Sequence, residues 1–285
     1  MLPQHLVAGT TELYGVIGWP LAQSLSPLLH NTAFAALGMP ALYRRWEVPP
    51  ETLSAFTTGV RLLGIRGCSV TIPHKTRLLP LLDAVSPLAR RVGAVNTLYW
   101  RDKALCGDNT DVAGFMAPLE REDLAGGHVL LLGAGGAARA AAAGLTSLPE
   151  GRRPAAVYVA TPSDRSHLPL AEEFGLVPLR WKDRHEPAAR LVVNATPLGM
   201  RGKAETESPF DFSRTPPLPG ECPLAYDIVY NPPETRFLRE ARAAGRRCVT
   251  GLAMFFSQGN AQFRLWTGRD LPPQARQALE AALKG

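Results

Sequence analysis

The sequence predicts an α/β protein of two domains, each built on a mainly parallel sheet. Three observations lead to this prediction. At 285 residues the chain is longer than one small hydrophobic core usually serves. Short β-type runs alternate with single helical stretches, which is the order of β-α-β units. A glycine-rich turn, GAGGAA, lies between a β-type run at 129–132 and an alanine-rich helical run that ends near Leu145. The second half is therefore predicted to be a Rossmann-type domain.

The first half is predicted to alternate strands with helices. A serine followed by proline is typical of a helix start, because serine caps the helix and proline fits its first turn. This pattern occurs at Ser26-Pro27 and at Ser86-Pro87. Gly38 is expected to end the first of these helices. The predicted strands are 13–18, 41–48, 65–72 and 95–99, and the predicted helices are 26–37, 53–63 and a segment after Ser86.

The second half continues the alternation and leads to two further helices. Residues 201–223, rich in proline and polar side chains, are predicted to form a long loop. Helices are predicted at 253–266 and 273–283, and we expect them to pack back on the first domain. The predicted domains are residues 1–112, completed by 253–285, and residues 113–252. The other predicted strands are 155–160, 191–193, 225–229 and 248–249, with a helix near 170–174.

Composition excludes several classes of protein. Hydrophobic residues make up 46% of the chain and charged residues 20%, as in ordinary globular proteins. No apolar run approaches the roughly 18–20 residues that cross a bilayer, and no secretion signal is evident, so we expect a cytoplasmic protein without a membrane partner. The net charge of +6 is spread along the chain, so we expect no nucleic-acid partner. The cysteines and histidines lack ligand spacing, so we expect neither disulfides nor a metal.

The glycine-rich turn fits the pattern G-x-G-x-x-A. In this pattern the first glycine permits a tight turn, the second lets a pyrophosphate approach the backbone, and a small third residue lets helix and strand pack closely. The unpaired N–H groups and the dipole of the following helix favour a phosphate at this position. The predicted dinucleotide-binding residues are Gly133, Ala134, Gly135, Gly136 and Ala137.

The end of the predicted strand 155–160 bears on the choice between NAD and NADP. NAD-binding domains usually have an acidic residue there, which accepts from the ribose 2′-hydroxyl. Here Thr161 and Pro162 follow the strand instead. Arg165, with the hydroxyls of Thr161 and Ser163, is suited to a 2′-phosphate. NADP is therefore the predicted cofactor, NAD remains the alternative, and a solvated surface role is the alternative for Arg165.

Eight motifs contain polar or glycine residues at positions where the fold itself would require only hydrophobic strands and helix caps. They are SLSP (24–27), GCSVTIPHK (67–75), GAVNT (93–97), GDNTDVAG (107–114), GAGGAARA (133–140), NATPLGM (194–200), DIVYNPPET (227–235) and GLAMFFSQG (251–259). In this order they resemble the shikimate dehydrogenase family, from about Val16 to Trp266. The resemblance implies an oxidoreductase of the shikimate pathway for aromatic amino acid biosynthesis. Its small-molecule substrate would be 3-dehydroshikimate, reduced reversibly to shikimate with NADP.

Lys75 and Asp111 are the predicted catalytic residues. Oxidation of a secondary alcohol needs a group that takes the hydroxyl proton as hydride leaves the carbon, and returns it in the reverse direction. A lysine can exchange a proton, whereas an arginine cannot. Lys75 stands out because arginine is the usual basic residue of this chain. We predict Lys75 as general acid/base beside Asp111; on residue chemistry alone the alternative is a surface ion pair.

The resemblance also implies two sets of binding residues. On residue chemistry alone, Ser26 would cap a helix, Asn96 would stabilise a turn and Gln258 would lie on a helix surface. The implied substrate ligands are Ser24, Ser26 and Tyr230 for the carboxylate, and Thr71, Asn96 and Gln258 for the ring hydroxyls. The implied nicotinamide side consists of Thr196, Ile228, Gly251 and Met254, the last as a packing residue.

Two positions depart from the family pattern. Ser69 stands where asparagine is usual, and Ala160-Thr161-Pro162 replaces a common Asn-Arg-Thr sequence. The alternatives to an NADP-dependent shikimate dehydrogenase are a quinate/shikimate or aminoshikimate dehydrogenase that uses NAD and, from a different class, a dinucleotide-binding sensor without catalysis. We expect a monomer or a homodimer.

Overall fold

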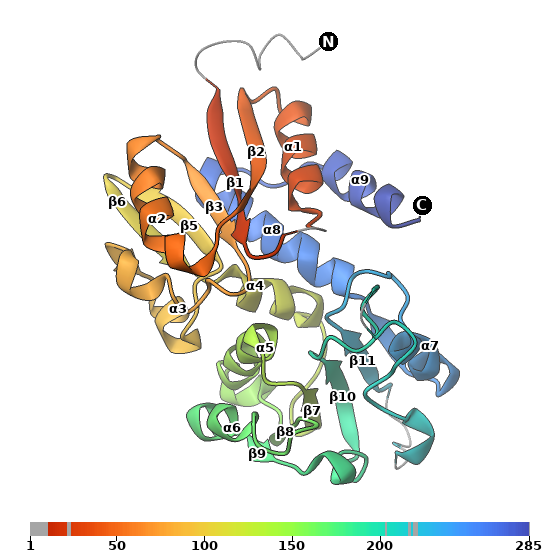
Figure 1. The fold of residues 1–285 in the computed structure, drawn as a ribbon. Helices are drawn as coiled ribbons and strands as arrows, with labels where there is room; N and C mark the ends of the chain where they lie inside the picture. Colours follow the sequence, from red (N-terminus) through yellow and green to blue (C-terminus); the bar gives the residue numbers. More distant parts are fainter. Residues whose placement is uncertain (1–10, 22–23, 203, 216–217, 219–221, 285) are drawn as a thin grey trace. The chain divides into compact units, whose positions relative to one another are not determined.

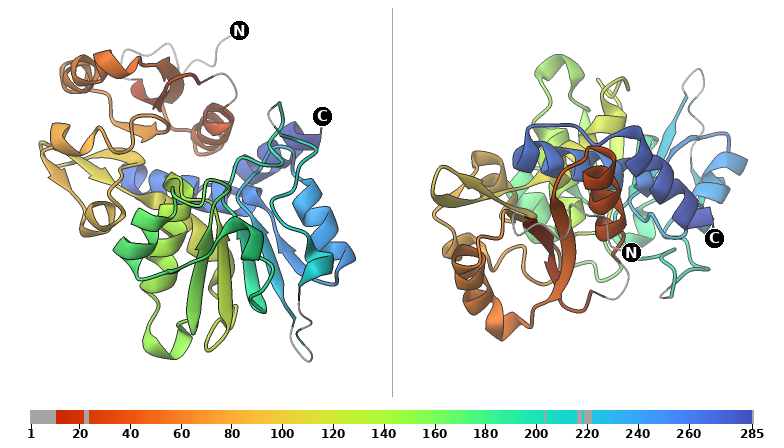
Figure 2. Two further views of the ribbon diagram at one scale, coloured as in Figure 1. Left: turned by 60° about the horizontal axis from the view of Figure 1, so that its bottom comes forward. Right: turned by 90° about the horizontal axis from the view of Figure 1, so that it is seen from above.

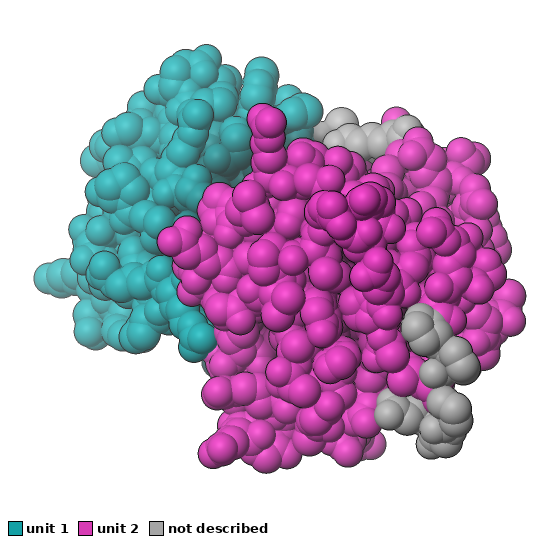
Figure 3. Space-filling model, turned by 90° about the horizontal axis from the view of Figure 1, so that it is seen from below, with its two compact units in different colours: residues 1–110, 258–285 teal, residues 111–257 magenta. Residues whose placement is uncertain are grey.

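The structure, a computed structural model, describes residues 11–21, 24–202, 204–215, 218 and 222–284. The chain forms two compact units (Figure 3). Unit 1 comprises Met1–Thr110 with Gln258–Gly285, and unit 2 comprises Asp111–Ser257. The predicted boundaries, after residues 112 and 252, fall close to these divisions. No helix within the described residues is long and apolar enough to cross a membrane.

Unit 1 contains a six-stranded sheet in the order β2-β1-β3-β5-β6-β4 (Figure 1). The sheet is mainly parallel, as predicted, but β5 runs antiparallel to both β3 and β6. A turn at Asp102, which adopts the left-handed conformation with φ 56°, returns the chain directly from β5 to β6. The sequence did not predict β4 or β6. The elements are β1 (Glu12–Gly18), α1 (Ser26–Ala36), β2 (Ala41–Glu47), α2 (Leu53–Leu62), β3 (Gly67–Val70), β4 (Ala84–Val85), α3 (Pro87–Val92), β5 (Thr97–Arg101), β6 (Ala104–Asp108), the end of α8 (Gly251–Thr267) and α9 (Pro273–Lys284).

The two faces of this sheet have different cores, because side chains alternate along a strand. On one face Ile17 and Val70 belong to an aliphatic cluster with α2 and α3. On the other face Tyr14 and Tyr43 contact aromatic rings from α1 and α8. The Trp266 Nε1 of α8 donates to the carbonyl of Leu98 at 2.9 Å, and α9 packs against α1. The prediction that the C-terminal helices pack on the first domain is therefore confirmed.

Unit 2 contains a fully parallel sheet in the order β12-β11-β10-β7-β8-β9, which is a Rossmann arrangement (Figures 1 and 2). The strand order reverses between β7 and β10. The sequence did not predict α4, α7 or β9. The elements are α4 (Thr110–Met116), β7 (His128–Leu132), α5 (Gly136–Thr146), β8 (Ala156–Ala160), α6 (Leu168–Phe174), β9 (Val177–Pro178), β10 (Ala189–Asn194), β11 (Leu224–Asp227), α7 (Arg236–Ala243) and β12 (Arg247–Val249).

Helices cover both faces of this second sheet. On one face Leu130 and Ala225 join Phe237 of α7 in an apolar cluster. On the other face the Tyr226 ring is stacked on Phe115 of α4, with centroids 5.0 Å apart. Short 3-10 helices connect elements in both units, at Pro50–Thr52, Leu79–Leu81, Ala117–Leu119, Glu150–Arg152, Trp181–Asp183 and Phe212–Arg214.

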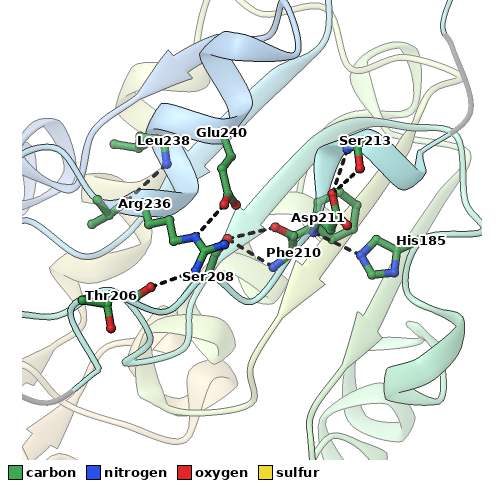
Figure 4. A network of polar contacts seen from close by, with 10 residues as sticks. His185, Thr206, Ser208, Phe210, Asp211, Ser213, Arg236, Leu238 and Glu240 are labelled. Atoms are coloured by element: carbon green, nitrogen blue, oxygen red, sulfur yellow. Dashed lines mark hydrogen bonds and ion pairs between the residues drawn. The ribbon is translucent and has the colours of Figure 1, made fainter.

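The predicted loop at 201–223 is fixed by polar contacts where it is described (Figure 4). The Asp211 N–H donates to His185 Nε2 at 3.1 Å, and Asp211 Oδ1 accepts from the Ser213 hydroxyl at 2.6 Å. The Arg236 guanidinium of α7 donates to the carbonyl of Thr206 at 3.1 Å. The loop therefore has a defined path beside the start of α7.

Candidate active site

The ends of strands β1 and β3 bring Gly18 and Thr71 together. The Thr71 N–H donates to the carbonyl of Ile17 at 2.9 Å. A Cβ on Gly18 would lie 2.5 Å from Cγ2 of Thr71, so glycine is needed beside this threonine. Thr71 is half buried. It lies at the carboxyl ends of two parallel strands, where α/β sheets bind ligands.

Ser24 and Ser26, the predicted carboxylate ligands, lie at the start of α1. The prediction that Ser26 caps this helix is wrong. Ser26 is the first helical residue, and Leu25 precedes it as the cap residue without a side-chain hydrogen bond. Instead, Ser24 Oγ accepts from the Ser26 N–H at 3.3 Å. Ser24 can satisfy this N–H group because it lies two residues earlier, outside the helix. The Ser26 hydroxyl is not used as a cap.

Lys75 follows β3 in a turn that hydrogen bonds fix in place. The His74 N–H donates to the carbonyl of Thr71 at 3.0 Å, and the Val95 N–H donates to the carbonyl of Lys75 at 2.7 Å. The buried His74 Nε2 lies 2.7 Å from the carbonyl oxygen of Val48. Because a carbonyl oxygen only accepts, Nε2 carries the hydrogen. These contacts place the backbone of Lys75 next to the GAVNT motif, and its side chain is half buried.

Asn96 is buried between β5 and the start of α4. Its Oδ1 accepts from the Thr110 N–H and from the Thr97 hydroxyl, both at 2.7 Å, while its Nδ2 donates to Thr110 Oγ1 at 3.0 Å. Asp111 follows Thr110 in the first turn of α4 and is buried. Lys75 and Asp111 belong to different units, so their pairing stays a prediction.

Two glutamines lie one turn apart on the same face of α8. Gln258, the predicted ligand of a ring hydroxyl, is half buried. Gln262 is 1% exposed, and its amide contacts both β3 and β5. Its Oε1 accepts from Ser69 Oγ at 2.7 Å, and its Nε2 donates to Thr97 Oγ1 at 3.0 Å. No sequence motif singled out Gln262, because its partners are far away along the chain.

In unit 2 the glycine-rich turn lies where the strand order reverses. Gly133 has a φ of 116°, and a Cβ there would lie 2.6 Å from the carbonyl oxygen of Ala195 in the turn after β10. Only glycine tolerates both conditions. A Cβ on Gly135 would have no atom within 4 Å, so the backbone before α5 faces open space. Ala138 is fully buried. The turn from Gly133 to Ala137 therefore fits a dinucleotide pyrophosphate.

The segment after β8 contains the predicted 2′-phosphate ligands. Thr161 is buried, and its Oγ1 lies 2.8 Å from His167 Nδ1 and accepts from the Ser166 hydroxyl at 3.0 Å. Ser163 Oγ accepts from the N–H groups of Arg165 and Ser166 at 3.3 and 3.1 Å. These hydroxyls shape the turn itself. Arg165 is exposed, and its guanidinium has no hydrogen-bond or ion-pair partner within the described residues.

Asn194 and Asp227 connect the turns after β10 and β11. Asn194 Nδ2 donates to Asp227 Oδ1 at 3.0 Å, and Asn194 Oδ1 accepts from the Thr196 hydroxyl at 2.7 Å. Asp227 also accepts from the Val229 N–H at 3.0 Å and from the Thr235 hydroxyl at 2.5 Å. Burial raises the pKa of Asp227 to about 7, although these donors oppose the shift. The backbone and hydroxyl of Thr196 are thereby fixed next to the glycine-rich turn.

The start of α8 packs against the turn after β11. A Cβ on Gly251 would lie 2.4 Å from the carbonyl oxygen of Ile228, so glycine lets the helix begin there. Met254 is buried, which fits a packing role. The Tyr230 ring lies against Phe255, with centroids 4.7 Å apart. Tyr230 thus belongs to unit 2, whereas the other predicted substrate ligands belong to unit 1.

The cysteines and metal-ligand residue types form no cluster. In the described part of the chain, no group of three or more His, Cys, Asp or Glu side chains could hold a metal ion. The thiols of Cys68 and Cys106 are free and buried, and burial raises the pKa of Cys68. The candidate site residues therefore offer hydroxyls, amides, one lysine, the carboxyl group of Asp111 and a glycine-rich turn.

The strand order of unit 2 and the open glycine-rich turn define the chain as a two-domain, dinucleotide-binding α/β protein. Residues 16–98 match the family described as shikimate dehydrogenase substrate binding domain. A shikimate dehydrogenase (NADP(+)) of Pelobacter propionicus is 52% identical over 96% of this chain and 97% of its own length. The chain therefore belongs to the shikimate dehydrogenase family.

Solved structures agree with this assignment. The shikimate 5-dehydrogenase of Thermus thermophilus, in complex with NADP(H) and shikimate, is 40% identical, with a TM-score of 0.83 over 95% of this chain and 100% of that one. The enzyme of Listeria monocytogenes, in complex with shikimate and NAD, is 30% identical, with a TM-score of 0.82 over 96% of this chain and 97% of that one. The predicted family and fold are thus confirmed.

Proposed function

We propose that the chain catalyses the reversible, NADP-dependent reduction of 3-dehydroshikimate to shikimate. The observation that carries this proposal is the 52% identity to a shikimate dehydrogenase (NADP(+)) along nearly the whole chain. The eight motifs of the family pattern lie within this match. Two features of the structure support it: a polar cluster at the strand ends of unit 1, and an open glycine-rich turn at the strand-order reversal of unit 2.

Unit 1 would supply most of the residues that bind and protonate the substrate, and unit 2 would supply Tyr230 and Asp111. Ser24 and Ser26 would hold the carboxylate, with Tyr230, and Thr71, Asn96 and Gln258 would bind the ring hydroxyls. Lys75 Nζ would give a proton to the carbonyl oxygen during reduction and take it back during oxidation, and Asp111 would orient the ammonium group. Thr71 and Lys75 are separated by one turn whose backbone is hydrogen-bonded, which suits a fixed geometry for proton transfer.

Unit 2 would bind the dinucleotide. NADP, when bound, supplies or accepts the hydride. Residues Gly133–Ala137 would bind the pyrophosphate, and Thr196, Ile228, Gly251 and Met254 would line the nicotinamide side. Arg165 would pair with the 2′-phosphate. Its exposure supports this role, as does the lack of a polar partner of its guanidinium within the described residues. Thr161 and Ser163 would act mainly by shaping the turn that presents Arg165.

Steady-state kinetics with two substrates and two cofactors test this proposal. We expect the highest kcat/KM with shikimate and NADP, and lower values with quinate or with NAD. Arg165→Ala should raise the KM for NADP while it leaves the KM for NAD unchanged, and Arg121→Ala, an exposed arginine of the same unit, should change neither. A protein that bound dinucleotide but turned over neither acid would instead be the sensor. Preferred turnover of quinate with NAD would favour the alternative dehydrogenase.

A further inference from the structure

Five buried side chains of unit 1 form one continuous hydrogen-bond chain. It runs from Tyr43 on β2 to Ser69 on β3, then to Gln262 on α8, and through Thr97 on β5 to Asn96. Every member is less than 9% exposed. Four of the five, all except Asn96, have no role in the proposed function. The chain ends on Asn96, a proposed ligand of a substrate hydroxyl.

The orientation of the Gln262 amide is fixed by its partners. One of its terminal atoms lies 3.2 Å from the backbone carbonyl oxygen of Asn96. A carbonyl oxygen only accepts, so this atom must be Nε2. The other terminal atom is therefore Oε1, and it lies 2.7 Å from Ser69 Oγ. Ser69 must donate its hydroxyl hydrogen to Gln262.

This orientation determines the direction of every other hydrogen bond. Because the Ser69 hydrogen points to Gln262, the phenol of Tyr43 must donate to Ser69 Oγ, at 2.6 Å. Burial raises the pKa of Tyr43, so the phenol keeps the hydrogen that it donates. At the other end, Gln262 Nε2 donates to Thr97 Oγ1, which leaves the Thr97 hydrogen for Asn96 Oδ1. All the bonds run in one direction, from Tyr43 to Asn96.

The last bond fixes how Asn96 meets a ligand. Its Oδ1 accepts from the Thr97 hydroxyl and from the Thr110 N–H, each at 2.7 Å, so its two lone pairs are used inside the protein. Asn96 can therefore meet a ligand only through Nδ2, which also donates to Thr110 Oγ1 at 3.0 Å. We propose that Gln262 is a positioning residue that, through Thr97, makes Asn96 a hydrogen-bond donor to a substrate oxygen. An N–H donor serves a hydroxyl and a carbonyl oxygen equally, which suits a site that binds both an alcohol and its ketone.

Three buried titratable side chains of unit 1 in this region are uncharged near neutral pH. His30 of α1 lies against Tyr43 with ring centroids 4.6 Å apart, and burial lowers its pKa to about 3. Burial raises the pKa of Tyr43 on β2 and of Cys68 on β3. The rings of Phe263 and Trp266 cover the same region from α8. Because His30 lies within reach of Gln262, a carboxyl group placed at position 262 would titrate together with this histidine.

The inference rests on the proposed function, and the variant Gln262→Glu tests it. In this variant a protonated carboxyl group at position 262 can still donate to Thr97, whereas the carboxylate would accept the Thr97 hydrogen and withdraw it from Asn96. We expect the KM for shikimate to be near the wild-type value at low pH and to rise about tenfold as the buried carboxyl ionises. The KM for NADP should not change. Arg264→Ala, an exposed position of the same helix, should match the wild-type protein at every pH.

A second variant covers the case in which Gln262→Glu does not fold. Thr97→Val removes the linking hydroxyl but keeps the shape, so the KM for shikimate should rise about tenfold at every pH. If wild-type protein oxidises shikimate but neither variant differs from Arg264→Ala in KM, the inference is wrong while the proposed function stands. If wild-type protein does not oxidise shikimate at all, the proposed function is wrong, and the inference that rests on it is wrong with it.

Discussion

The two units fix their polar side chains with different chemistry. In unit 1 the buried hydrogen-bond chain from Tyr43 to Asn96 consists only of neutral hydroxyls and amides. In unit 2 a carboxyl group, Asp227, joins the turns after β10 and β11. Burial also shifts the pKa of a titratable side chain in each unit: it lowers the pKa of His30 to about 3 in unit 1, and it raises the pKa of Asp227 to about 7 in unit 2.

These two shifts have one cause and opposite consequences. Burial disfavours the charged form of each side chain. The charged form of histidine is the protonated form, so His30 binds fewer protons in the folded protein than in the unfolded chain. The folded protein therefore loses stability as pH falls from about 6.5 toward about 3. The charged form of aspartate is deprotonated, so Asp227 contributes stability that is lost as pH rises from about 4 to about 7. The contributions of these two side chains to stability should therefore respond to pH in opposite directions.

Removal of His30 should have the largest effect. His30→Phe keeps an aromatic ring against Tyr43 and Phe263 but cannot titrate. Between about pH 6.5 and pH 3.5, wild-type protein should lose about 4 kcal/mol of unfolding free energy relative to the variant. Amide hydrogen exchange in unit 1 measures this difference. Parallel pH profiles for the two proteins would show that His30 does not make unit 1 acid-sensitive.

Asp227→Asn tests the opposite slope in unit 2. The amide can still accept from Asn194 and Val229, and it does not ionise. From about pH 4.5 to pH 7, wild-type protein should lose about 3 kcal/mol relative to the variant. Amide exchange in unit 2 is the matching measurement. A wild-type protein that gained stability over this range relative to Asp227→Asn would mean that the donors, not burial, control the carboxyl group.

The two helix caps provide a smaller comparison. Ser86 caps α3 by accepting from the Ala89 N–H, and Thr235 caps α7 by accepting from the Leu238 N–H. Both hydroxyls also donate to a carboxylate: Ser86 to the half-buried Asp108, and Thr235 to the fully buried Asp227. Ser86→Ala should therefore cost about 1 kcal/mol, and Thr235→Ala about 2 kcal/mol or more, in urea unfolding. Equal costs would show that the deeper burial of the bond from Thr235 to Asp227 adds no stability.

Local signals were sufficient to predict much of the fold. The strand at β1, the cap at Ser86 and the glycine-rich turn depend on neighbouring residues, and the structure confirms them. The cap at Ser26 was predicted wrongly because Ser24 offers the same hydroxyl outside the helix. Strand β6 was missed because its end lies in a polar motif, and its pairing with β5 depends on the turn at Asp102.

Long-range contacts explain what the sequence did not reveal about the site. Gln262 contacts Ser69 and Thr97, which precede it by more than 160 residues. Asp227 belongs to a recognised motif, but its role as a connection to Asn194 depends on the neighbouring positions of β10 and β11 in the sheet. Patterns in a single sequence do not show which residues distant along the chain make contact. The family resemblance could therefore identify the substrate ligands, but not the residues that hold those ligands in place.

The proton-transfer role of Lys75 is the central claim, and it is tested most directly by the kcat for shikimate oxidation in Lys75→Met. The control is Lys103→Met, an exposed lysine of the same unit. We predict a loss of at least about a hundredfold in kcat for Lys75→Met, with the KM for NADP unchanged, and no loss for the control. If both variants oxidised shikimate at the wild-type rate, Lys75 would not be the general acid/base.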